Sequence, residues 1–247
     1  MKNLLIIVFS LVCHNIFSQD LISTNQGDIK IHPILHGTLA LEYEGLTIYV
    51  DPYGGVDKFK GLKDADLILI TDIHGDHLNK ETLKDLNTSN SHFIVPEAVA
   101  QQMEGIGNAE IEILNNDNST SFNGINITAI PMYNLPESED SRHPKGRGNG
   151  YLLNIADKVI YISGDTEDIP EMRALKNIDL AFVCMNIPYT MSVEQASDAV
   201  LDFNPSIVYP FHFRGQGGLA DVEKFKSLVK KENKDIEVRL RNWYSED

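Results

Sequence analysis

The pattern of hydrophobic and polar positions along this chain predicts many short strands and a few separate helices. Extended segments at 29–35, 38–42 and 46–50 are separated by tight turns, which is typical of an antiparallel meander. A fully apolar run at 67–70 predicts a buried strand, and residues 80–86 have helical spacing. A polar loop therefore joins a buried strand to a helix in the first third of the chain.

The same mixture continues to the end of the chain. Further strands are predicted at 92–95, 111–114, 125–131, 151–155, 159–162, 180–183 and 207–209, and helices at 97–104, 167–175, 193–203 and 220–232. Runs of strands interrupted by single helices predict an α+β protein with two sheets and helices outside them. The one long irregular segment is 134–150, and loops of this length are often functional.

The first 18 residues resemble an export signal more than a part of the fold. Lys2 precedes an apolar run at 4–13 that is too short to span a bilayer. A small residue at Ser18 favours a mature start at Gln19, whereas Cys13 lacks the small preceding residue of a lipid-attachment site. We expect a signal peptide at 1–18, a single domain at 19–247, and an exported protein, periplasmic or secreted, without a membrane anchor.

Composition narrows the class of function. The chain has 247 residues, 42% of them hydrophobic, which is enough for one sizeable core but short for two domains. Its formal charge is −15, or −16 once Lys2 is removed, and no long basic run is present, so a nucleic-acid partner is not expected. Cys184 would be the only cysteine left, which excludes an intramolecular disulfide and favours a buried hydrophobic role for it.

The strongest chemical signal is the segment 72–77, which directly follows the apolar run. Four of its six side chains are potential metal ligands: Asp72, His74, Asp76 and His77. Three of these stand at alternate positions and project toward one side of an extended loop, while His77 points elsewhere, so that one segment can serve two ions. The alternative is a solvated turn in which Asp76 or Asn79 caps the next helix, but a cap does not require histidines.

With Thr71, this segment resembles the Thr-His-x-His-x-Asp-His signature of the metallo-β-lactamase superfamily, with Asp72 in place of the first histidine. The resemblance extends in order over nearly everything after the signal peptide, and it implies a four-layer αββα sandwich. Asp51 resembles the buried aspartate that supports the metal loop. Asp165, in a glycine turn, resembles the carboxylate that bridges two ions, with a helix cap as the alternative. His212 resembles the last metal-binding histidine of the family.

The family's middle histidine is not at the expected strand end, where this chain has Met132-Tyr133-Asn134. His143, in the following loop, is the nearest candidate, and Asn134 is a weaker ligand or a hydrogen-bonding residue behind the site. The run from Tyr133 to Tyr151 resembles a branch that contains ascorbate-lactonase-like hydrolases. His36 also recurs near the site in that branch, although a buried hydrogen-bonded histidine explains it nearly as well.

The resemblance implies two divalent ions. Asp72, His74 and His143 would hold one ion, Asp76, His77 and His212 the other, and Asp165 would bridge them. Asp76 and His143 are the expected catalytic residues, with Asp76 relaying a proton to the leaving group. A water shared by the ions would lose a proton near neutral pH and attack the substrate. Zinc is the first expectation, and the hard oxygen ligand of Asp72 keeps manganese and iron(II) as alternatives.

The sequence thus predicts a dinuclear metal-dependent hydrolase that uses a metal-bound hydroxide on a small ester or lactone. Lys145 and Arg147, beside the predicted site, could orient an anionic substrate or could simply lie in a solvated loop. Alternatives are a small-molecule phosphodiesterase and a β-lactam hydrolase. A non-catalytic metal-binding protein of the same fold also remains open, because Asp72 and the missing strand-end histidine depart from the signature.

Overall fold

Two seven-stranded sheets form the centre of the protein, and each half of the chain builds one of them. The computed structural model describes residues 20–106 and 110–244. The first sheet has the strand order β1-β2-β3-β4-β5-β6-β7. Its strands are β1 (Asp20–Thr24), β2 (Gly27–Leu35), β3 (Thr38–Tyr43), β4 (Leu46–Val50), β5 (Leu67–Leu69), β6 (His92–Val95) and β7 (Glu110–Ile113).

The second sheet has the order β16-β13-β12-β11-β10-β9-β8. Its strands are β8 (Ser119–Phe122), β9 (Ile125–Met132), β10 (Gly148–Ile155), β11 (Lys158–Ile162), β12 (Leu180–Cys184), β13 (Ile207–Phe211) and β16 (Glu237–Val238). A small hairpin of β14 (Arg214–Gly215) and β15 (Gly218–Leu219) follows β13. In both sheets an antiparallel meander passes into parallel strands, at β4 to β7 and at β11 to β13.

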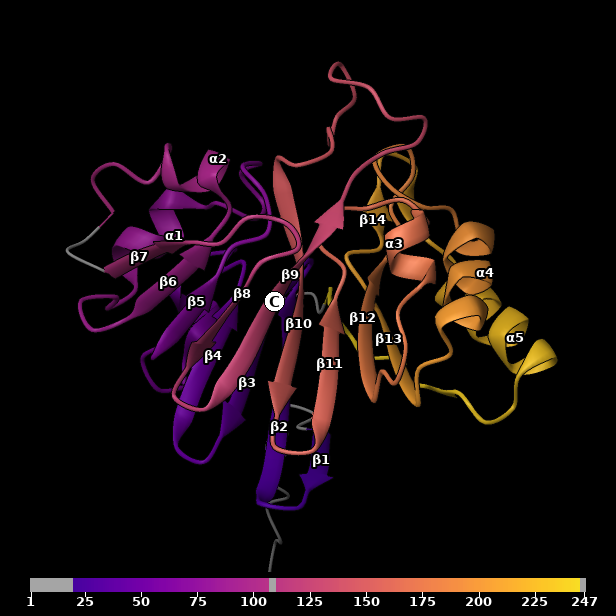
Figure 1. Ribbon diagram of the computed structural model, residues 1–247, viewed down its shortest axis with the longest axis horizontal. Coiled ribbons are helices and arrows are strands. Elements are labelled where there is room, and N and C mark those ends of the chain that lie inside the picture. The colour runs from indigo at the N-terminus through magenta and orange to yellow at the C-terminus, as the bar shows by residue number, and fades with distance from the viewer. Residues whose placement is uncertain (1–19, 107–109, 245–247) are drawn as a thin grey trace, which may run out of the picture.

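Helices cover the outer face of each sheet, as Figure 1 shows. On the first sheet lie η1 (Val56–Phe59), α1 (Lys80–Asp85) and α2 (Glu97–Ala100), and on the second α3 (Pro170–Arg173), α4 (Val193–Phe203) and α5 (Val222–Glu232). Leu83 of α1 and Val99 of α2 pack on the outer face of the first sheet, and inner-face residues of both sheets share one core. The predicted α+β, four-layer αββα sandwich is confirmed.

Most predicted elements are present, but two helices are shorter than their patterns indicated. The helix predicted at 167–175 begins only at Pro170, because the residue before a proline disfavours the helical region and Ile169 is extended. The helix predicted at 97–104 ends at Ala100 and gives way to turns. The predicted signal peptide lies outside the described residues. None of the helices within 20–106 and 110–244 has the length and apolarity needed to cross a membrane.

The parallel strands place the polar loops at one edge of the molecule. Asp51 follows β4, the segment 72–77 follows β5, Asp165 follows β11, and His212 follows β13. Backbone hydrogen bonds join these loops across the two sheets, from Asn149 N–H to the Thr71 carbonyl (2.9 Å) and from His212 N–H to the His36 carbonyl (3.0 Å). Residues far apart in the chain therefore meet at this edge.

Candidate metal centre

The loop after β5 turns sharply before α1. The backbone N–H groups of His77 and Leu78 both donate to the His74 carbonyl, at 2.9 and 2.8 Å. Asn79 caps α1 by accepting the N–H of Thr82 at 2.9 Å. Since Asn79 performs the capping, the side chain of Asp76 is left for another role.

Asp51 supports this loop from behind. One carboxylate oxygen of Asp51 accepts the Thr71 N–H at 2.7 Å, and the other accepts the Thr71 hydroxyl at 2.6 Å and lies 2.8 Å from His77 Nδ1. All three residues are buried. With Nδ1 bonded to a carboxylate, the Nε2 atom of His77 is the one directed into the site, as in histidines that bind metals.

His143 is held in a similar way by Asn134. The Asn134 side-chain oxygen accepts the His143 N–H at 2.8 Å and lies 3.1 Å from His143 Nδ1. The amide nitrogen of Asn134 donates to the carbonyl of Tyr189 at 2.8 Å and to Glu167 at 3.2 Å, which fixes its orientation. The two roles left open by the sequence are thus distinguished: His143 faces the site, and Asn134 orients it.

Asp165 lies at the centre of the cluster. Its Oδ2 atom is 3.2 Å from His143 Nε2 and 3.3 Å from His77 Nε2, and its Oδ1 atom is 3.4 Å from His212 Nε2. The preceding Gly164 has a φ of 61°, and a Cβ there would lie 2.6 Å from the Met132 sulfur. The turn that delivers Asp165 therefore requires glycine.

All seven predicted ligands fall into groups whose ligand atoms lie within 4.8 Å of one another. The three groups are Asp72, His74 and His143; His77, Asp165 and His212; and His36, Asp76 and His212. The first group matches the set predicted for one ion. The other two share His212 and together contain the predicted second set, the bridging Asp165 and, in addition, His36.

The side chains themselves show that they fit a metal. Across the described ranges, nine buried side-chain polar atoms have no hydrogen-bond partner, and six of these belong to five residues of the cluster. They are His74 Nδ1, His77 Nε2, His143 Nε2, Asp165 Oδ1, and Nδ1 and Nε2 of His212. Partnerless buried polar groups are costly and rare in folded proteins. Nitrogen and carboxylate atoms gathered in this way form a donor set suited to divalent transition metals.

His36, which the sequence left open, adjoins this cluster. Its Nε2 is 3.2 Å from Asp76 Oδ2, its Nδ1 is 2.7 Å from the Tyr244 hydroxyl, and its ring centroid is 3.7 Å from that of His212. Tyr244 was not singled out from the sequence, because an isolated aromatic residue near the chain end carries no motif. The site thus has a further histidine and a tyrosine behind it.

Comparison with known proteins agrees with this geometry. A family model described as "Beta-lactamase superfamily domain" matches residues 30–212, which includes every predicted ligand. The chain belongs to the metallo-β-lactamase superfamily. A UPF0173 metal-dependent hydrolase of Pyrococcus horikoshii is 30% identical over 211 residues, covering 81% of this chain and 92% of the relative.

Solved structures share the fold of this protein. A candidate metal-dependent hydrolase from Parabacteroides distasonis is 36% identical, with a TM-score of 0.80, and the match covers 91% of this chain and 98% of that one. A metallo hydrolase from Ignicoccus hospitalis shares the fold at 23% identity, with a TM-score of 0.72 and coverage of 86% and 94%. The resemblance to the ascorbate-lactonase-like branch remains a prediction.

The charges in this superfamily member's site strongly perturb one another. Burial raises the pKa of Asp165, but His212, His77 and His143 together hold it well below its usual range. Burial likewise lowers the pKa of His77, yet Asp165, Asp51 and Asp76 bring it well above its usual value. In the metal-free protein, a proton on the His77 imidazole thus supplies part of the positive charge that a cation would supply.

Both cations predicted beside the site are engaged in ion pairs. Arg147 donates to the two carboxylate oxygens of Asp72, at 3.2 and 3.3 Å. Lys145 pairs with Glu171 at 3.0 Å and with Glu137 at 3.1 Å. Neither is simply solvated, and neither presents an unpaired charge to a substrate.

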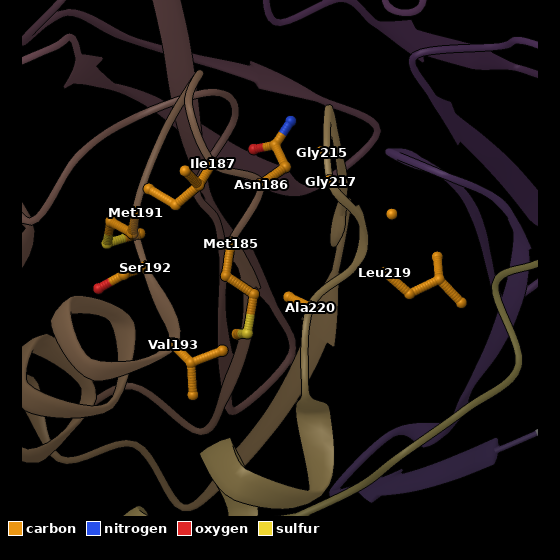
Figure 2. A pocket seen from close by; sticks show the side chains of 11 residues that line it. Met185, Asn186, Ile187, Met191, Ser192, Val193, Gly215, Gly217, Leu219 and Ala220 are labelled. Carbon is orange, nitrogen blue, oxygen red and sulfur yellow. The ribbon is translucent and has the colours of Figure 1, made fainter.

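An apolar pocket of about 270 Å³ lies between the segment that follows β12 and the β14–β15 hairpin (Figure 2). Met185, Met191, Val193, Leu219 and Ala220 contribute its apolar lining. The Met185 N–H donates to the His212 carbonyl at 3.4 Å, so the pocket adjoins the metal centre through the backbone. None of the predicted ligands lines it, and it is therefore a separate feature from the centre.

Proposed function

We propose that this protein is a metal-dependent hydrolase that cleaves a small ester or lactone at a two-ion centre. The observation that carries the proposal is the cluster of buried imidazole and carboxylate atoms around Asp165, which lie in contact with one another while several of them make no hydrogen bond. The family assignment supports it, since relatives across most of the chain are named metal-dependent hydrolases. The substrate class and the number of ions are our inference.

In this proposal each ion has its own set of residues. Asp72, His74 and His143 hold one ion, Asp76, His77 and His212 hold the other, and Asp165 lies between the sets. Two divalent ions, when bound, would activate a water molecule and stabilise charge that develops on the substrate oxygen. We favour zinc because each set contributes two histidine nitrogens, with manganese or iron(II) as alternatives.

The three carboxylates of the site differ in solvent exposure, and this difference indicates which of them can contact a substrate. The side chains of Asp72 and Asp165 are 0% and 5% exposed, whereas that of Asp76 is 32% exposed. Of these three, Asp76 is the one that a substrate can reach. We therefore assign to its Oδ2 atom, which His36 Nε2 approaches at 3.2 Å, a relay in which it accepts the proton lost by the attacking water and passes it to the leaving oxygen.

The electrostatics favour a substrate whose reacting part is neutral. The formal charge of the chain is −15, and both lysine and arginine candidates near the site are paired with carboxylates. A phosphodiester would bring a negative charge with which neither Lys145 nor Arg147 is free to pair, so that its binding would depend on the ions themselves. An ester or lactone carbonyl needs no such partner, and on this ground we place a small-molecule phosphodiester and a β-lactam behind it. We expect no nucleic-acid partner.

A substrate screen tests the function. The purified protein is assayed for bound metal and for hydrolysis of generic esters, lactones, phosphodiesters and β-lactams, with and without a chelator. We expect chelator-sensitive turnover of an ester or lactone, and none in Asp165→Ala. Chelator-sensitive cleavage of phosphodiesters alone would contradict the substrate class. Two bound ions without any chelator-sensitive turnover would instead support a non-catalytic metal-binding protein.

We also propose that the protein is exported to the periplasm or secreted. Removal of residues 1–18 would leave Asp20 and strand β1 in the mature chain. The mass of the N-terminal peptide in the protein recovered outside the cytoplasm tests this, with a start at Gln19 expected. Recovery of an intact Met1 terminus in the cytoplasm alone would contradict export.

A further inference from the structure

Asp72 differs from the other carboxylates of the proposed ligand set because an arginine contacts it in addition to a histidine. Over residues 20–106 and 110–244, its two oxygens receive the Arg147 Nε and Nη2 groups at 3.2 and 3.3 Å, and no other carboxylate lies within 4.0 Å of the Arg147 guanidinium. His74 Nδ1 also contacts Asp72, whereas the ion-pair partners of Asp76 and Asp165 among the described residues are all histidines. A two-pronged arginine contact of this kind fixes both the position and the charge of a carboxylate.

The loop between β9 and β10 is built to deliver this arginine. The Arg147 N–H donates to the Pro144 carbonyl at 3.3 Å, closing a turn, and Arg147 Nη2 donates to the Arg142 carbonyl at 2.5 Å. Gly146, with a φ of 86°, allows the turn. The guanidinium is thus held against Asp72 by the same loop that carries His143.

The pairing matters because Asp72 is fully buried beside His74. Both oxygens of Asp72 accept hydrogen bonds from the guanidinium, which is the arrangement of an ionised carboxylate, and Asp72 therefore adds a negative charge where the signature has a neutral histidine. A guanidinium at hydrogen-bond distance offsets that charge.

We propose that Arg147 is a positioning residue that neutralises Asp72, so that the Asp72–Arg147 pair takes the place of the neutral histidine of the signature. This rests on the proposed function, because it concerns the ion held by Asp72, His74 and His143. Arg147 stabilises the Asp72 carboxylate in the metal-free protein and weakens the attraction of this carboxylate for the ion of the first site. The two residues consequently depend on each other, and exchanging one alone leaves a charge without its partner.

A double-mutant cycle tests this dependence with Zn²⁺ as the probe. The variants are Arg147→Gln, Asp72→His and their combination, and the control is Arg142→Gln, because the Arg142 guanidinium lies on the Tyr189 ring. Zn²⁺ affinity is measured by competition with a chromophoric chelator, ions per chain by elemental analysis, and thermal stability with and without Zn²⁺.

Arg147→Gln should lower the melting temperature of the metal-free protein and raise the affinity of the first site for Zn²⁺ by about tenfold. Asp72→His alone should weaken that site by about 10- to 100-fold, because Arg147 then lies unpaired beside the cation. The double variant should recover most of this loss, and Arg142→Gln should match the unmodified protein. Arg147→Lys, which keeps the charge, should also stay close to it.

Three outcomes would overturn the inference. The first is weaker Zn²⁺ binding in Arg147→Gln than in the unmodified protein, which would mean that Arg147 only orients Asp72. The second is a folded Arg147→Lys that binds Zn²⁺ as weakly as such an Arg147→Gln, which would mean the same. Additive effects of Asp72→His and Arg147→Gln would mean that the residues act independently. If the unmodified protein binds Zn²⁺ and only the cycle fails, the proposed function stands; if it binds no divalent ion, both proposals fall.

Discussion

His77 and His143 point the same ring nitrogen, Nε2, into the site, but different groups hold them from behind. The carboxylate of Asp51 contacts Nδ1 of His77, and the amide oxygen of Asn134 contacts Nδ1 of His143. A carboxylate both orients an imidazole and makes it more basic, whereas a neutral amide mainly orients it. The two proposed ligands therefore differ in how strongly they donate to an ion.

Asn134→Ala should weaken binding of the ion at His143. The substitution removes the oxygen that contacts the backbone N–H and the Nδ1 atom of His143. Loss of such a supporting residue costs about 10- to 100-fold in metal affinity. Competition titration with Zn²⁺ measures the change. Asn126→Ala, on an exposed position of β9, is the matched control and should bind normally. Unchanged affinity in Asn134→Ala would mean that the loop alone orients His143.

The sequence could predict which residues meet at the site better than it could predict what lies behind them. The segment 72–77 is recognisable from its density of potential metal ligands, and His143 was the nearest candidate for the family's middle histidine. Tyr244 and the pairing of Arg147 with Asp72 depend on contacts between positions more than 70 residues apart. No local pattern records such contacts.

At the scale of elements, periodicity found the buried strands and the edge strand β7 but missed the other edge strands, β1, β8 and β16. Strands such as β4 and β9 are apolar on a buried face and appear where the pattern predicted them. The missed strand β8 is largely polar and β16 has two residues, so their structure is set by the strand beside them. Local propensity cannot supply that information.

The first strand, β1, is held by the end of the chain. Arg241 donates to both oxygens of Asp20, at 2.8 and 2.7 Å, and the Tyr209 hydroxyl donates to one of them at 2.8 Å. The side chain of Asp20 is only 11% exposed. Asp20→Asn should therefore lower the free energy of unfolding by about 1–3 kcal/mol, because it removes the charge that pairs with Arg241.

The effect of Asp20→Asn should depend on pH. Burial raises the pKa of Asp20, but Arg241 and Tyr209 lower it by more, so that the folded pKa lies below the ordinary aspartate value of 3.8. The carboxylate's contribution is therefore present above about pH 4 and is lost as the pH falls through the folded pKa. Urea unfolding at pH 7 and pH 3 measures the difference. Asp28→Asn, on an exposed position of β2, is the control; an equal loss there would contradict a specific role for Asp20.

On the scale of the whole molecule, the proposed metal centre joins the two sheets. Asp72, His74, Asp76 and His77 come from the loop after β5 of the first sheet, and His143, Asp165 and His212 come from loops of the second. Each proposed ion thus has ligands from both halves of the chain. These residues lie between positions 72 and 212 and meet only when the chain folds. In the sequence, their order along the family signature was the one indication that they would meet.

Removal of metal should consequently lower the stability of the folded protein where the two sheets meet. A ligand present at about 100 times its Kd stabilises the folded state by about 2.7 kcal/mol, which for a chain of this size corresponds to about 5–10 °C in melting temperature. We expect chelation to lower the melting temperature by this order and added Zn²⁺ to restore it. Hydrogen exchange should rise around 71–77, 163–166 and 212 and stay unchanged in α5.

Asp165→Ala separates this effect from general destabilisation. The variant lacks the carboxylate between the two sets, so its metal content and melting temperature should both fall, and neither chelator nor Zn²⁺ should move the melting temperature further. Asp140→Ala, on an exposed position of the loop that carries His143, should respond to both as the unmodified protein does. Unchanged metal content in Asp165→Ala would mean that the ions, if bound, lie elsewhere, because a residue within 3.4 Å of three of the histidines cannot be dispensable to a centre built on them.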